Sequence, residues 1–152
     1  MIMILNDVLT KQSVFSKLLI KDGEKELPKE LKVKVMRIRM AYSKCKQNFD
    51  AELQEFLNEL ITPEFKDLSS KEERTSQEET LLQELTQKVN SECQVYIAQK
   101  SKEEVSMIDD TFTENEFADI VEVNAGNDVE INGNKLTAMD FLEAVHELFV
   151  KE

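Results

Sequence analysis

The sequence predicts a mainly helical α+β fold: a long antiparallel helical hairpin with a small β-sheet and a C-terminal helix. Three observations predict it. Apolar residues recur at steps of three and four from Pro28 to Ile61, which is helical spacing. A second apolar stripe follows within residues 71–91, and short alternating apolar segments lie near both chain ends. The 152 residues suit a single domain that buries an ordinary core.

The first 28 residues are expected to form a strand and a short helix. Residues 1–5 are apolar and typical of a short strand. Thr10 is a suitable N-cap for a helix, and Gly23 can end it because glycine adopts the left-handed conformation cheaply. The apolar face of this expected helix consists of Val14, Phe15, Leu18 and Leu19.

The long helix predicted over residues 28–61 has two different halves. Residues 29–46 carry seven basic side chains and one acid, whereas residues 50–59 carry four acids and no base. This order opposes the helix dipole, which favours acids near the start and bases near the end. An interaction other than that with the helix dipole must therefore favour this order of charges.

The basic half also has a second apolar line on the side away from the main stripe. An exposed line of this kind is unusual, so we expect it to be covered, either within the chain or by a protein partner. The candidate partner surface consists of this line and its basic neighbours: Val33, Met36, Met40, Lys32, Arg37 and Arg39.

A second helix is expected over residues 71–91, capped by Ser69 or Ser70, and packed antiparallel on the acidic half of the first. The segment 93–97 is ambiguous. It alternates as a strand would, but Val89, Cys93 and Tyr96 also continue the helical period. We favour a strand, because asparagine and serine at 90 and 91 are poor in a helix interior.

The charge divides the domain into two parts. Residues 1–102 contain 17 bases and 17 acids, while residues 103–152 contain 14 acids and two bases and so carry the whole net charge of −12. We expect this acidic part to dock on the basic half of the long helix, within one chain or between chains. Salt would weaken that docking.

The acidic part is expected to contain a β-hairpin between two helices. Thr113 and Glu116 have the spacing of a capping box before a short helix. Residues 120–123 and 129–131 are typical of two strands joined by a turn. Thr137 caps the last helix, whose apolar face is Phe141, Leu142, Val145, Leu148 and Phe149.

No segment predicts catalysis, a metal or a cofactor. Residues 128–140 resemble a calcium loop, but a start at Asp128 puts Met139 at the position of the bidentate acid, and a start at Val129 puts apolar residues at ligand positions. His146 is the one histidine and has no metal or triad motif around it. The three glycines lie too far apart for a phosphate loop. We expect a non-enzymatic protein.

Composition also indicates the compartment and the class of partner. Cys45 and Cys93, far apart in sequence, fit free thiols in a reducing cytoplasm. The chain has no run near the roughly 20 apolar residues that a membrane span needs. Nucleic acid is not expected as a partner, because an overall basic footprint is missing. The basic half of the long helix could by itself still contact nucleic acid, through Lys32, Lys34, Arg37, Arg39, Lys44 and Lys46.

Two short motifs support a resemblance. A Leu-Pro step at Glu26–Lys29 precedes the basic helix, and a Leu-Thr pair at the start of Leu136–Leu142 introduces the last one. With this layout the chain resembles a family of small uncharacterised proteins of tailed bacteriophages and prophages, over roughly half its length. The residues from 100 to 134 form a longer segment than that family has. The resemblance implies a phage setting in a bacterial host cell, and no catalytic residues.

Two functions of different classes are compatible with these observations. The first is a non-enzymatic phage or prophage protein that binds a protein partner or itself, or acts in assembly, through its helical surfaces. The alternative is an acidic inhibitor that mimics DNA and blocks a host protein acting on nucleic acid. Residues 103–152 would supply its acids.

Overall fold

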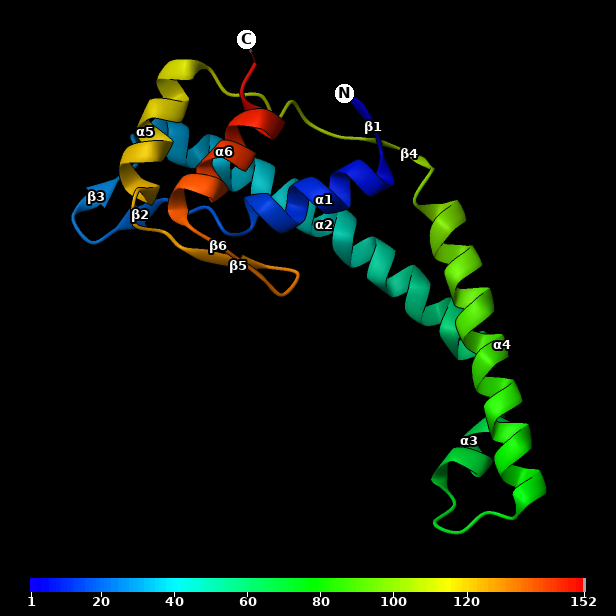
Figure 1. Ribbon diagram of the computed structural model, residues 1–152. Coiled ribbons are helices and arrows are strands. Elements are labelled where there is room, and N and C mark those ends of the chain that lie inside the picture. The colour runs from blue at the N-terminus through cyan, green and yellow to red at the C-terminus, as the bar shows by residue number, and fades with distance from the viewer. Residues whose placement is uncertain (152) are drawn as a thin grey trace. The chain divides into compact units, whose positions relative to one another are not determined.

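The computed structural model describes residues 1–151 and confirms a mainly helical α+β fold (Figure 1). The helices are α1 (Leu5–Phe15), α2 (Lys29–Leu60), α3 (Pro63–Ser70), α4 (Ser76–Lys100), α5 (Glu114–Asn124) and α6 (Ala138–Phe149). The strands are β1 (Ile2–Ile4), β2 (Lys21–Asp22), β3 (Lys25–Glu26), β4 (Glu104–Ser106), β5 (Val129–Ile131) and β6 (Asn134–Leu136). Over the described residues the strands pair as three separate two-stranded antiparallel sheets, β1–β4, β2–β3 and β5–β6, rather than as one small sheet.

The chain forms two compact units. Unit 1 comprises residues 1–46 together with the chain from residue 104 onward, and unit 2 comprises Gln47–Glu103. The basic half of α2 belongs to unit 1 and its acidic half to unit 2. The acidic C-terminal part therefore shares a unit with the basic half of the long helix.

Helix α1 begins directly after β1, which corrects the expected start at Thr10. No side chain caps its N-terminus at Ile4. Leu5 and Val8 are buried in unit 1, as is Phe15 at the other end of the helix. Burial of this face thus decides where α1 begins, and the cap residue does not.

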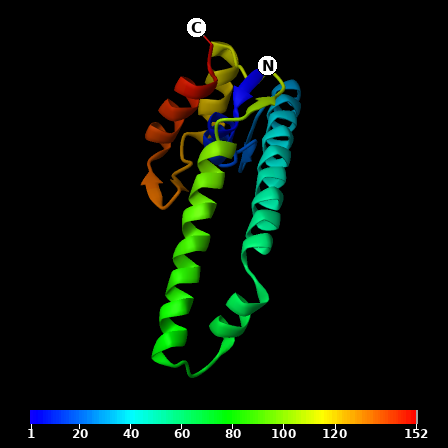
Figure 2. The same cartoon turned by 90° about the vertical axis from the view of Figure 1, so that its right-hand side faces the viewer.

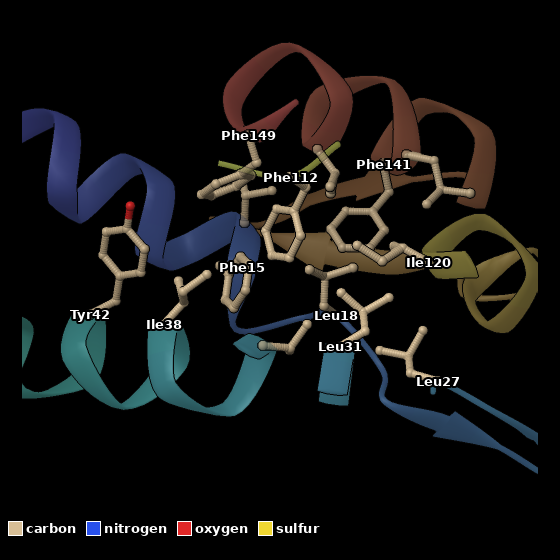
Figure 3. Close-up of a cluster of buried hydrophobic side chains, with 14 of the residues drawn as sticks. Phe15, Leu18, Leu27, Leu31, Ile38, Tyr42, Phe112, Ile120, Phe141 and Phe149 are labelled. Carbon is tan, nitrogen blue, oxygen red and sulfur yellow. The ribbon is translucent and has the colours of Figure 1, made fainter. Parts of the chain in front are cut away.

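The core of unit 1 is centred on an aromatic cluster (Figure 3). The ring of Phe15 lies 5.1 Å from that of Phe149, and 6.1 Å from those of Tyr42 and Phe112. Phe112 also forms backbone hydrogen bonds with Phe149 and Lys151, which attach the segment before α5 to the end of α6. The cluster joins α1, α2 and α6 into one core.

Helix α5 replaces a strand expected at residues 120–123. The predicted capping box is present, since Thr113 and Glu116 accept from each other's backbone N–H groups. The helix then continues through the β-branched residues to Asn124, because Ile120, Val123 and Asn124 form its buried face. The side-chain amide of Asn124 accepts from the backbone N–H of Leu19 at 2.9 Å and donates to the carbonyl of Leu19 at 3.1 Å. It thus bonds to the backbone of Leu19 as a residue of a neighbouring strand would.

The hairpin of the acidic part lies at β5 and β6, so its first strand is residues 129–131 and not 120–123. Asn132 and Gly133 form the turn with φ of 52° and 81°, as a two-residue hairpin turn of the primed type requires. Thr137 caps α6 as predicted. Asp128 of the calcium-like sequence accepts from the backbone N–H of Ala138 at 2.8 Å, so it supports the start of α6.

Unit 2 is the predicted antiparallel helical hairpin, with α3 in the connection between its two long helices (Figure 2). Phe56 stacks on Tyr96 with ring centroids 4.3 Å apart, and Lys100 lies 2.6 Å from Glu52. Residues 93–97 belong to α4, so the strand expected there is wrong. A helical continuation lets Tyr96 and Lys100 meet the facing helix, which outweighs the weak helix propensity of residues 90 and 91. Helix α4 begins at a capping box on Thr75, not at Ser69 or Ser70, which lie in α3.

Candidate functional site

The outer side of α2 in unit 1 exposes the second apolar line of the sequence. Val33, Met36 and Met40 have exposed fractions of 40%, 45% and 69%. The buried residues of the helix lie on its opposite side: Leu31, Val35, Ile38 and Tyr42. Unit 1 therefore does not cover the line. This apolar line and the unpaired bases beside it form a surface that we call the α2 face.

The basic residues around this line differ in whether another group of the chain already pairs with them. Lys29, Arg37 and Lys44 are exposed and form no ion pair with any residue that the structure describes. Lys32 pairs with Glu26. Arg39 donates to the backbone carbonyl of Leu18, and burial lowers the pKa of its guanidinium. The α2 face thus consists of Lys29, Val33, Met36, Arg37, Met40 and Lys44.

The acidic part contacts the basic half of α2 at Lys34. Its ammonium lies 2.9 Å from Glu116 Oε1 and 4.6 Å from the centre of the Phe112 ring. Burial raises the pKa of Glu116, but hydrogen bonds from the backbone N–H of Thr113 and from Lys34 outweigh it and leave that pKa below its usual value. This ion pair is a direct contact between the two oppositely charged parts of the sequence.

Replacing Glu116 by glutamine should lower the melting temperature at neutral pH, because the charge on Lys34 loses its partner. The folded pKa of Glu116 is depressed, so its contribution is present above the unfolded value near pH 4.3 and is lost as pH falls through the folded value. The difference from wild type should begin to decrease near the unfolded value, disappear only below the lower folded pKa of Glu116, and shrink in high salt. Glutamine keeps the capping box. Glu122→Gln on the same helix is the control, and a difference that persists at low pH would contradict the assignment.

A groove of about 580 Å³ lies between α5 and α6, on unit 1. Apolar side chains line most of it: Phe117, Val121, Ala125, Met139 and Leu142, with Glu143 and His146 beside them. His146 Nε2 lies 2.9 Å from Glu114, and its ring meets Phe117 edge-on at 4.9 Å. Met139 is 71% exposed. We call this the α5–α6 groove.

The two helices that form the α5–α6 groove are acidic. Helices α5 and α6 contain no lysine or arginine, and their acids are Glu114, Glu116, Asp119, Glu122, Asp140, Glu143 and Glu147. Of these, Glu116 is paired with Lys34 and Glu114 with His146. Glu143 lines the groove itself, so the groove is apolar and lies on two helices with an excess of negative charge.

A buried polar cluster joins three segments of unit 1. Asp110, with an exposed fraction of 1%, accepts from the Tyr42 hydroxyl and lies 2.9 Å from the Lys11 ammonium. Burial, and next the hydrogen bond to Asp110, raise the pKa of Tyr42. Tyr42 therefore stays protonated at neutral pH and donates a hydrogen bond, which is a structural role.

Neither a metal-binding cluster nor a membrane-spanning helix occurs within residues 1–151. Over this range no group of three or more histidine, cysteine or acidic side chains is placed to hold a metal ion. None of the helices there combines the length and apolar character that a membrane crossing needs.

Sequence patterns revealed the α2 face but not the α5–α6 groove. The groove depends on residues 120–123 being helical, because Val121 then lies one turn from both Phe117 and Ala125. The capping box at Thr113 was the sequence feature that could have indicated a helix through these residues. Comparison with known family models, curated proteins and solved structures found no match to the chain.

Proposed function

We propose that this chain is a non-enzymatic interaction or assembly protein of phage or prophage type, acting in the cytoplasm of a bacterial host, and that the α2 face is its contact surface. The observation that carries the proposal is the exposure of Val33, Met36 and Met40 beside unpaired bases. The phage setting rests on the resemblance of the Leu-Pro step and the closing helix.

The composition of the α2 face suits protein contact. Methionine is flexible and polarisable, and it is frequent at surfaces that bind protein helices. An apolar line flanked by charges is also the usual pattern of a helix that docks on another protein. Bases outnumber acids on the basic half of α2, whose one acid is Glu30, and this excess of positive charge favours a partner with a negatively charged surface.

In-cell photo-cross-linking tests the proposal. Met40 would be replaced by a photo-cross-linking amino acid, and Val95, also an exposed apolar residue on a helix, would be replaced in a control chain. We expect covalent protein adducts from position 40, identified by mass spectrometry, that Met36→Glu reduces. Equal adduct yields at positions 40 and 95, or no effect of Met36→Glu, would overturn the proposal.

A DNA-mimic inhibitor is the second candidate function. The observation that favours it is the acidic outer surface of α5 and α6, which contain seven acids and no lysine or arginine. A mimic of this kind would compete with DNA for a host binding protein, and neutralising Glu143 and Glu147 would abolish that competition. The apolar groove between these two helices fits a protein contact better than it fits a mimic of the evenly charged surface of DNA.

A further inference from the structure

The α2 face and the α5–α6 groove are complementary in charge. The α2 face contains three unpaired bases, whereas α5 and α6, which form the groove, contain seven acids and no lysine or arginine. Opposite signs across a contact guide its formation and exclude surfaces of like charge. A partner that brings a basic apolar helix is therefore the kind that the groove favours.

The two surfaces also match in length. The line from Val33 to Met40 extends about 10 Å at the helical rise of 1.5 Å per residue. The groove residues Phe117 to Ala125 on α5 extend about 12 Å, and Met139 to His146 on α6 about 10 Å. Two methionines and a valine, spaced at one helical turn, can therefore lie along the groove.

One copy cannot bring its own two surfaces together. The α2 face lies on the side of α2 opposite its buried residues, while the groove lies between two other helices of unit 1. A contact between them must join two copies head to tail. Such contacts between unlike surfaces extend into rings or filaments, unlike a two-fold dimer that uses one surface twice.

We infer that the α5–α6 groove of one copy binds the α2 face of a second copy. Val33, Met36 and Met40 insert between α5 and α6, while Arg37 and Lys44 face Glu143 and other acids of these two helices. The inference rests on the proposed function, since it names the partner of the same α2 face. The patch is small compared with a stable interface, so the contact is weak and depends on concentration and salt.

Two variants, each blocking one surface, test the inference. Met36→Gln with Met40→Gln removes the apolar line and keeps helix propensity. Met139→Lys with Glu143→Lys makes the groove basic at exposed positions. We expect sedimentation velocity to show concentration-dependent oligomers of the wild type in low salt. Each variant should weaken this association at least about tenfold.

The decisive measurement is the equimolar mixture. Each variant keeps the surface that the other lacks, so the mixture should form a one-to-one dimer that grows no further. Val95→Gln controls for loss of an exposed apolar residue, and Glu72→Lys with Glu73→Gln controls for the change in net charge. Circular dichroism would confirm that all variants are folded.

The outcomes separate this inference from the proposed function. A wild type that stays monomeric at high concentration in low salt, or a mixture that forms no dimer, would overturn the head-to-tail contact. Adducts from position 40 to other proteins would then still support the α2 face as a contact surface. The absence of adducts would reject the proposed function itself.

Discussion

Replacing Phe15 by alanine is expected to lower the free energy of unfolding by about 4 kcal/mol, in the range typical of a buried phenylalanine. Phe15 is 1% exposed, and its ring contacts the rings of Tyr42, Phe112 and Phe149. The substitution leaves a cavity where α1, α2 and α6 meet. Urea denaturation followed by circular dichroism would measure the loss.

A graded pair of variants makes this expectation specific. Phe15→Leu keeps most of the buried volume and should cost clearly less than alanine. Met40→Ala also removes a large apolar side chain, but from an exposed position, and should change stability by no more than about 0.5 kcal/mol. Similar losses from Phe15→Ala and Met40→Ala would contradict the assignment of core and surface.

Sequence patterns predicted the longest and best-capped elements well. Helix α2 begins and ends within a residue of its expected bounds, because a long apolar stripe lies between a Leu-Pro step and Pro63. Helix α6 follows the predicted cap at Thr137. Where many residues share one period and a turn residue marks each end, local signals agree and few alternatives remain.

Short segments were predicted less well, because local propensity and tertiary packing disagree there. Residues 120–123 are β-branched or acidic and typical of a strand, but Ile120 and Val123 are buried only when the segment is helical. Residues 93–97 fit both periods, and the contact of Tyr96 with Phe56 favours the helix. In both cases the deciding partner lies far away in the sequence.

The candidate surfaces show the same difference. The α2 face could be recognised because all of its residues lie on one helix and share one period. The α5–α6 groove combines two helices whose pairing no local pattern encodes. The buried cluster around Asp110 could not be predicted either, since nothing near Asp110 in the sequence indicates that its carboxylate contacts Tyr42 and Lys11.

Replacing Asp110 by alanine is expected to cost about 3 kcal/mol, the second largest effect predicted for this chain. The change leaves the Tyr42 hydroxyl buried without its acceptor and the Lys11 ammonium without its partner. Tyr42→Phe should cost less, because Asp110 keeps its ion pair with Lys11. Urea denaturation of both single variants would measure these costs.

The double variant distinguishes a coupled cluster from two independent contacts. Once Asp110 is absent, Tyr42→Phe removes a buried hydroxyl that no longer has an acceptor, so the second substitution should cost little or restore stability. The summed cost of the two single variants should therefore exceed that of the double variant by about 1 kcal/mol or more. Strictly additive costs would show that the Tyr42 hydroxyl does not depend on Asp110. Coupling would establish this buried hydrogen bond as a second link, beside the Lys34–Glu116 ion pair, between the basic half of α2 and the acidic part of the chain.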